Sequence, residues 1–227
     1  MHIGILQCGH TPDQVAAVHG DYDNLFITLF DGQGLTFKTW DVVDMAFPDS
    51  IDAAEGWLIT GSKHGAYEDH AFIPPLEDFI RAAHVAEKPM IGICFGHQII
   101  AQALGGRVEK FAGGWAVGRH AYDVGGETIH LNAWHQDQVV ERPQGARRVA
   151  GSEFCENAAL VYGEHIMTVQ PHPEISNSVL ASYLDARAGD PNYPDGLFQE
   201  ARSHLETPTD DLAYAARLAT FLKEARP

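Results

Sequence analysis

The 227-residue sequence has few cysteines, few basic residues and no long hydrophobic run. Its three cysteines, Cys8, Cys94 and Cys155, include no Cys-x-x-Cys pair, which argues against a disulfide framework and for a reducing compartment. No stretch approaches the roughly 18 uninterrupted apolar residues that a membrane span needs. The apolar run 3–6 has neither the basic region nor the hydrophobic core of a signal peptide. We therefore expect a cytoplasmic protein without a membrane partner.

Positive charge is also scarce. Fifteen Lys and Arg residues stand against 31 Asp and Glu residues, which gives a formal net charge of -16 and a sequence pI near 5.1. This balance argues against a nucleic-acid partner. The sequence contains neither a Walker A motif nor a glycine-rich dinucleotide fingerprint, and its 13 histidines show no His-x-x-x-His spacing. We therefore expect no cofactor and no metal site.

A hydrophobic content of 45% supplies enough apolar residues for a full core, and a single domain, 1–227, is the simplest organisation. Short apolar runs alternate with helical patterns in the first half of the chain, which predicts an α/β fold with an open, mostly parallel sheet flanked by helices. Between 107 and 170, short strands and glycine turns predict a partly antiparallel region that returns to the main sheet at Ile166. The expected strands are 3–7, 35–43, 56–60 and 90–93, and the expected helices are 13–30, 75–87, 95–104, 175–186 and 210–225.

Cys94 is the most informative residue, because it follows the apolar run 89–93 and precedes a helix that we expect to begin at Phe95. A strand, a turn flanked by Gly92 and Gly96, and a helix together predict a nucleophile elbow built around a thiol. The first turn of a helix offers unpaired N–H groups and a partial positive charge, which favour thiolate over thiol. The alternative is a small core cysteine in an ordinary strand-to-helix turn.

A partner for the thiol lies downstream, where the apolar run 166–170 leads into Pro171-His172-Pro173-Glu174. The prolines favour an extended backbone, in which residues two apart face the same side, so that His172 and Glu174 can project together. A carboxylate beside an imidazole fixes the ring tautomer and stabilises the imidazolium that a Cys–His pair needs. The pattern predicts a nucleophile, a base and an orienting carboxylate; the alternative is a rigid strand exit with a solvated His and Glu.

A third apolar strand, 56–60, runs into a loop that begins at Gly61. Attack on an acyl carbon places negative charge on oxygen, and paired backbone N–H donors are the usual way to stabilise it. We expect one donor from Phe95 and the other from Gly61. Because sites in open α/β sheets gather outside the carboxyl ends of the strands, Gly61, Cys94 and His172 are predicted to converge.

These residues resemble the class I (triad) glutamine amidotransferases. The matching pieces are Gly-Ile-Cys-Phe-Gly-His-Gln at 92–98, Gln-Pro-His-Pro-Glu at 170–174 and Thr-Gly-Ser at 60–62, in the order of the family, and the likeness covers nearly the whole chain. The resemblance implies a flavodoxin-like sheet and hydrolysis of the γ-amide of glutamine through a γ-glutamyl thioester, with release of ammonia and glutamate.

The resemblance also implies roles for individual residues. Carried over, the catalytic residues are Cys94 as nucleophile, His172 as base and acid, and Glu174 as its orienting group, with Gly61 and Phe95 as oxyanion donors. The residues that it implies for the amino-acid end of the substrate are Gln98 and the segment Trp134, His135 and Gln136. Gln136 stands where many members have glycine, and Ser62 where many have proline.

Two enzymatic versions remain open. The sequence contains no motif that would use ammonia, so either a separate synthetase subunit consumes it or the chain is a stand-alone hydrolase that resembles the γ-glutamyl peptidases and acts on a γ-glutamyl conjugate. We expect a small γ-glutamyl substrate in both cases and prefer the stand-alone version. The alternatives are a catalytically silent regulatory or binding module on the same fold and a cysteine peptidase.

Overall fold

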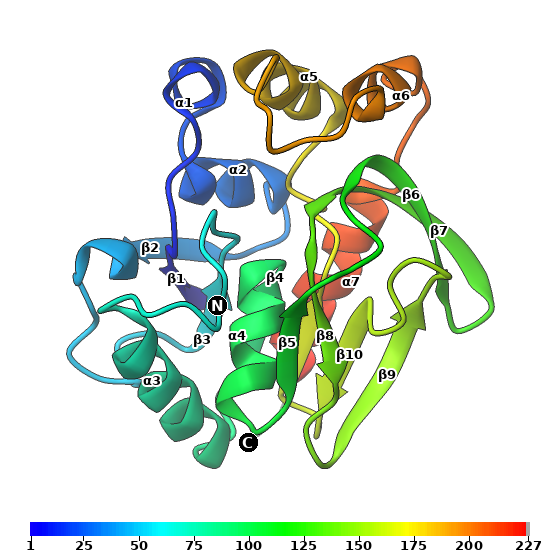
Figure 1. Ribbon diagram of the computed structural model, residues 1–227. Helices are drawn as coiled ribbons and strands as arrows, with labels where there is room; N and C mark the ends of the chain where they lie inside the picture. Colours follow the sequence, from blue (N-terminus) through cyan, green and yellow to red (C-terminus); the bar gives the residue numbers. More distant parts are fainter. Residues whose placement is uncertain (226–227) are drawn as a thin grey trace.

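Strands and helices alternate along the first half of the chain in the computed structural model, which describes residues 1–225 (Figure 1). The strands are β1 (His2–Leu6), β2 (Thr36–Trp40), β3 (Gly56–Ile59), β4 (Met90–Ile93), β5 (Arg107–Lys110), β6 (Ala116–Val124), β7 (Glu127–His135), β8 (Asp137–Glu141), β9 (Ala146–Gly151), β10 (Ala159–Tyr162) and β11 (Ile166–Val169). The helices are α1 (Asp13–His19), α2 (Tyr22–Leu29), α3 (Ile73–Val85), α4 (Phe95–Ala103), α5 (Asn177–Ala186), α6 (Leu197–Ser203) and α7 (Asp211–Glu224), with a 3-10 turn at Val42–Asp44.

The main sheet has the strand order β2-β1-β3-β4-β11-β10-β9-β6-β7. Strands β2, β1, β3, β4 and β11 are parallel, and β10, β9, β6 and β7 extend the sheet in antiparallel fashion. Strands β5 and β8 pair separately. The predicted α/β class, with an open and mostly parallel central sheet and an antiparallel region between 107 and 170, is confirmed, and the last strand does return beside β4.

Helices cover both faces of the sheet, and side-chain alternation along the strands decides what each residue meets. On β3, Trp57 and Ile59 pack in one apolar cluster with α3 and α4, while Leu58 packs in another with α2 and α7. Figure 1 shows α3 and α4 in front of the sheet and α7 behind it. A third apolar cluster joins α1, α2, α5 and α6 at one end of the molecule. No described helix is long and apolar enough to cross a membrane.

The expected helix 13–30 is wrong as a single element, because it divides into α1 and α2. Gly20 adopts φ 81°, a left-handed conformation that favours glycine, and Asp21 then caps α2 in a capping box with Asn24. The expected strand 35–43 is shorter, since the chain enters the 3-10 turn after Trp40. Helix α6 lies in a stretch for which no helix is expected. The last two residues of the proposed domain 1–227 lie outside the described residues.

Candidate active site

Cys94 occupies a sharp, strained turn between β4 and α4. Its φ of 53° and ψ of -102° lie in a region that residues other than glycine rarely adopt, and such a conformation costs on the order of 1–3 kcal/mol. Hydrogen bonds hold it: the N–H of Cys94 donates to the carbonyl of Val169 over 2.8 Å, and the carbonyl of Cys94 accepts from the N–H of Gln98 over 3.0 Å. Strands β4 and β11 and the first turn of α4 thus fix the backbone that presents the thiol.

The glycines around Cys94 allow the strands and α4 to approach one another closely. A Cβ atom on Gly96 would lie 2.2 Å from the carbonyl oxygen of Ile59, and one on Gly92 would lie 2.5 Å from the carbonyl oxygen of Gly96. Neither distance is compatible with a side chain. Both glycines are therefore required for the close contact of α4 with the strands, and Cys94 itself adopts the strained φ.

His172 and Glu174 form a buried ion pair beside Cys94. Nδ1 of His172 lies 2.6 Å from Oε1 of Glu174, and both residues are almost completely buried. The N–H of His172 also donates to the carbonyl of Asn132 over 2.8 Å, which attaches this segment to β7. Burial opposes the charge on the imidazole, but the Glu174 carboxylate and the Cys94 thiol together raise the pKa of His172 well above its usual 6.5.

The second nitrogen of His172, Nε2, is buried and has no partner with hydrogen-bond geometry among the described residues. The thiol of Cys94 is nevertheless near enough to contribute to the raised pKa of His172. The thiol and the imidazole are therefore adjacent.

Gln170 also contacts the thiol and was not among the expected site residues. Its Nε2 lies 3.6 Å from Sγ of Cys94, and its Oε1 accepts from Nε2 of Gln98 over 3.2 Å. Gln170 is fully buried at the end of β11. Gln170 directly follows β11 and precedes His172 by two residues, but the extended backbone expected through 170–174 is wrong. The chain bends after β11 and then turns, with the N–H of Ile175 donating to the carbonyl of His172 over 3.2 Å, and this turn brings Glu174 beside His172.

Gly61 and Phe95 lie on the two sides of this arrangement. A Cβ atom on Gly61 would lie 3.1 Å from Cε1 of His172 and 3.5 Å from Cε1 of Tyr22, so that the loop after β3 packs directly on the imidazole. Within the described residues, neither the N–H of Gly61 nor that of Phe95 donates to a backbone carbonyl. Tyr22, whose buried ring closes this side of the site, was also not among the expected site residues.

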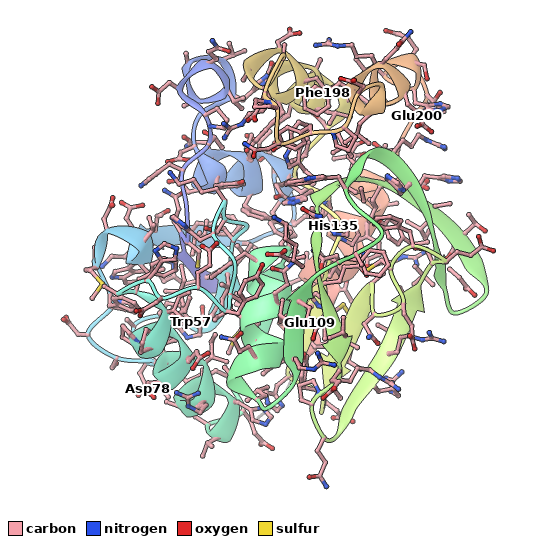
Figure 2. All side chains as sticks on the ribbon, viewed as in Figure 1. Trp57, Asp78, Glu109, His135, Phe198 and Glu200 are labelled. Carbon is pink, nitrogen blue, oxygen red and sulfur yellow. The ribbon has the colours of Figure 1, made fainter. Side chains whose placement is uncertain are left out.

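A cavity of about 240 Å³ opens over Cys94 and His172. All four residues expected to hold the substrate line it: Gln98, Trp134, His135 and Gln136. Figure 2 shows His135 in the middle of the molecule and Phe198 above it on α6. Burial lowers the pKa of His135 to about 3, with His172 contributing in the same direction, so that His135 is neutral near pH 7.

Three of the four expected substrate-binding residues donate hydrogen bonds within the protein. Nε2 of Gln98 donates to the carbonyl of Asp137 over 2.9 Å, and Nε1 of Trp134 donates to the hydroxyl of Tyr193 over 3.1 Å. Nε2 of Gln136 donates to the carbonyl of Phe111 over 3.4 Å. The cavity wall also carries basic groups that were not expected from the acidic composition: Lys63, Lys110 and Arg187.

Comparisons with known proteins identify the family of this chain. The model of the family described as Glutamine amidotransferase class-I matches residues 50–186, a range that contains Cys94, His172 and Glu174. Gamma-glutamyl peptidase 3 of Arabidopsis thaliana is 29% identical over 92% of this chain and 91% of the relative, and Gamma-glutamyl peptidase 4 is 30% identical over 94% and 92%. A GMP synthase of Porphyromonas gingivalis is 28% identical over 61% of this chain but only 29% of its own length.

Solved structures show the same fold. A glutamine amidotransferase from Thermotoga maritima superimposes with a TM-score of 0.77 at 22% identity, over 99% of this chain and 97% of that one. The corresponding values for a glutamine amidotransferase from Methylobacillus flagellatus are 0.75 and 21%, over 98% and 91%.

Proposed function

The chain belongs to the class I glutamine amidotransferase family and is an enzyme, and from that premise we propose that it hydrolyses a γ-glutamyl amide through a thioester on Cys94. The observation that carries this proposal is the buried His172–Glu174 pair, 2.6 Å apart and adjacent to a thiol on a strained elbow. The relatives include proteins named as gamma-glutamyl peptidases and a putative glutamine amidotransferase, which favours an enzyme over the silent module.

In the first half of the reaction, the thiolate of Cys94 attacks the γ-carbonyl carbon and forms a C–S bond. The carbonyl oxygen becomes an oxyanion. The N–H groups of Gly61 and Phe95, which donate to no backbone carbonyl in the described part of the chain, are suited as its donors. The intermediate collapses with cleavage of the C–N bond, and the imidazolium of His172 gives its proton to the departing nitrogen. The product is ammonia from glutamine, or an amine from a γ-glutamyl conjugate.

In the second half, His172 takes a proton from water, which attacks the thioester; glutamate leaves and the thiolate–imidazolium pair is restored. Glu174 contributes by holding the Nδ1–H tautomer and by stabilising the imidazolium in both halves. Burial strengthens this effect, because a charge interaction is screened far less away from water.

The amino-acid end of the substrate is assigned to the cavity wall formed by Gln98, Trp134, His135 and Gln136. Basic groups on the same wall, Lys63, Lys110 and Arg187, supply positive charge for a carboxylate. His135, which is neutral near pH 7, lines the same cavity. These basic groups suit the α-carboxylate of a γ-glutamyl substrate.

We favour the stand-alone hydrolase over the synthetase-dependent glutaminase. The named γ-glutamyl peptidases match this chain over more than nine-tenths of both lengths, whereas the GMP synthase matches over less than a third of its own length. A separate synthetase subunit that consumes ammonia is the second candidate, and glutamine is then the substrate.

A panel of substrates tests the proposal. The purified chain is given glutamine, a γ-glutamyl dipeptide, the α-glutamyl dipeptide of the same composition and a glutathione conjugate, and release of glutamate is measured. We expect turnover of about 1 per second or faster on a γ-linked substrate, none on the α-linked dipeptide, and none from a Cys94→Ser variant. Hydrolysis of the α-linked dipeptide alone would support a cysteine peptidase. No activity until a synthetase subunit is added would overturn the stand-alone version and leave the triad in place.

A further inference from the structure

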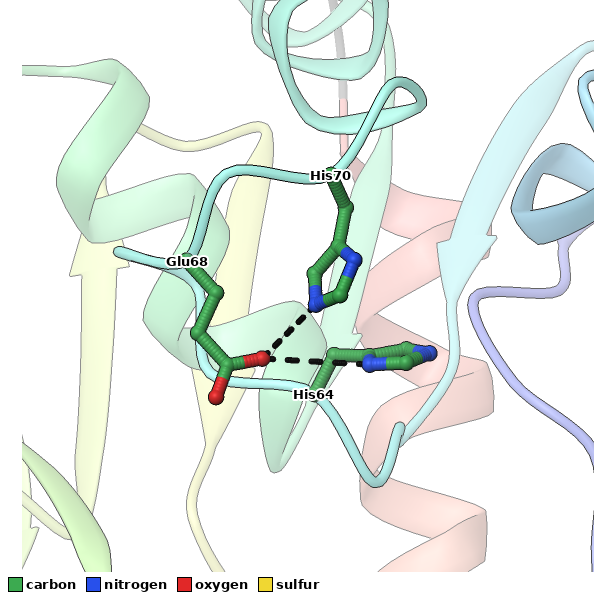
Figure 3. Close-up of side chains that lie close together, drawn as sticks. All are labelled: His64, Glu68 and His70. Carbon is green, nitrogen blue, oxygen red and sulfur yellow. Dashed lines mark hydrogen bonds and ion pairs between the residues drawn. The ribbon is translucent and has the colours of Figure 1, made fainter.

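Three potential metal ligands meet on the loop that leads from β3 to α3. Figure 3 shows His64, Glu68 and His70 pointing toward one another. Oε2 of Glu68 lies 2.7 Å from Nε2 of His70 and 3.8 Å from Nδ1 of His64, and all three ligand atoms lie within 4.8 Å of one another. The two imidazole rings are also in contact, with centroids 4.0 Å apart.

Hydrogen bonds to the loop carbonyls fix the backbone that carries these side chains. The N–H of Glu68 donates to the carbonyl of Gly65 over 3.1 Å, and the N–H of Ile73 donates to the carbonyl of His70 over 3.0 Å. From outside the loop, Nε2 of Gln102 donates to the carbonyl of Ala66 over 2.7 Å. The ligands are thus arranged before any ion arrives, which reduces the ordering cost of binding.

The spacing suits a small tetrahedral cation. Zinc binds imidazole nitrogen and carboxylate oxygen at about 2.0–2.2 Å, which places neighbouring ligand atoms roughly 3.3 Å apart. The 2.7 Å and 3.8 Å separations between Oε2 of Glu68 and the two histidine nitrogens bracket that value. Glu68 and His70 keep 46% and 34% of their side-chain surface exposed, which leaves an entry path and a position for water.

We propose that Nδ1 of His64, Oε2 of Glu68 and Nε2 of His70 bind a divalent transition-metal ion, with zinc as the representative member. Two imidazoles and one carboxylate, with a fourth position open, form a donor set that zinc uses in proteins. Since His64 and Glu68 also line the cavity over Cys94, a bound ion adds positive charge to the wall of that cavity. The inference does not depend on the proposed reaction.

The expectation of no metal site rested on the spacing of histidines along the sequence. His64 and His70 are six residues apart and lie in a loop, so neither helical nor zinc-knuckle spacing reveals them. Their convergence depends on the turn at Gly65 and on the return of the chain into α3, which a spacing rule does not contain.

Zinc affinity, measured by competition with a chromophoric chelator, tests the site. A Cys94→Ser background removes the thiol, which would otherwise compete for the ion. We expect one zinc ion per chain, and a loss of at least about 100-fold in affinity in His70→Gln, since even residues that only orient ligands contribute 10- to 100-fold. The matched control is His84→Gln, which disrupts a separate histidine pair, His84 and His165, whose ring nitrogens are 2.9 Å apart.

X-ray absorption identifies the atoms bound to zinc, and thermal unfolding shows whether the His70→Gln variant is folded. X-ray absorption at the zinc edge should show only nitrogen and oxygen neighbours, including two imidazoles, in the Cys94→Ser chain. His70→Gln should retain the thermal midpoint of its metal-free parent, because His70 is partly exposed. Absence of zinc binding in the folded Cys94→Ser chain would overturn the proposal. Equal losses in His70→Gln and His84→Gln, or a sulfur neighbour at the ion, would overturn it as well.

Discussion

Replacing Glu174 by glutamine tests how the buried ion pair contributes to catalysis. The change keeps the shape of the side chain but removes the charge that lies 2.6 Å from Nδ1 of His172. It also offers an amide N–H₂ group where the carboxylate accepted a hydrogen bond from Nδ1–H, which favours the wrong imidazole tautomer. Burial, which already opposes the imidazolium, is then balanced only by the thiol, and the pKa of His172 falls.

The expected loss of turnover in Glu174→Gln can be estimated from a related triad. In a Ser-His-Asp triad, the equivalent change from carboxylate to amide lowers turnover about 10⁴-fold, or about 5.4 kcal/mol at 1.36 kcal/mol per tenfold. A thiol ionises more readily than a hydroxyl and needs its base less, so we expect a loss of roughly 10²- to 10⁴-fold here. The alkaline limb of kcat/KM should also move to lower pH, because the departing amine requires imidazolium.

The His172–Glu174 pair also affects how the free energy of unfolding depends on pH. Its pairing raises the folded pKa of His172 above the usual 6.5, so its contribution is complete below about pH 6.5 and is lost as pH rises through the folded pKa. The difference in unfolding free energy between wild type and Glu174→Gln should therefore shrink with rising pH.

The assay is the rate of γ-glutamyl hydrolysis across pH, with urea unfolding at the same pH values. Asp21→Asn is the matched control, because Asp21 pairs over 2.5 Å with His10, which lines the cavity, and asparagine caps a helix as well as aspartate does. A Glu174→Gln rate within threefold of wild type, with an unmoved pH profile, would refute the assigned role of Glu174.

Three further predictions concern the elbow and its partner. Iodoacetamide should label Cys94 faster than Cys8 or Cys155 near neutral pH, as read by mass spectrometry, because burial raises the pKa of both other thiols, that of Cys155 to about 12; equal labelling rates would remove the activated-thiol assignment. Cys94→Ala should abolish the thioester, and His172→Ala should lower turnover by about two orders or more; wild-type turnover in folded His172→Ala would exclude His172. Gly96→Ala should destabilise the fold by about 1–3 kcal/mol or more in urea unfolding, since its Cβ meets the Ile59 carbonyl, and an unchanged midpoint would contradict the close approach.

Much of this architecture could be predicted because it depends on local patterns. The run 90–93 followed by Phe95 gave the elbow, since both strand and helix are short-range features. The placement of Gly61, Cys94 and His172 at neighbouring strand ends follows from the rule for parallel sheets. The roles assigned to them stay predictions.

Features that depend on long-range packing were not accessible in the same way. Trp134 on β7 packs on Tyr183, Tyr193 and Phe198, rings that come from α5, the loop after it and α6. The break between α1 and α2 was within reach, because Gly20 and Asp21 form a stop and a cap, but amphipathic periodicity runs through both helices and hides it.

The backbone strain at Cys94 creates a conflict between activity and stability during evolution. The residue that makes the protein reactive also holds a conformation in which most side chains cost about 1–3 kcal/mol, a substantial fraction of the 5–15 kcal/mol by which ordinary domains are stable. Selection for activity and selection for stability therefore act against each other at this one position. A lineage that lost the need for the activity could replace Cys94 with glycine, relieve the strain and keep the fold, so inactive relatives of such enzymes are expected to arise easily and to persist.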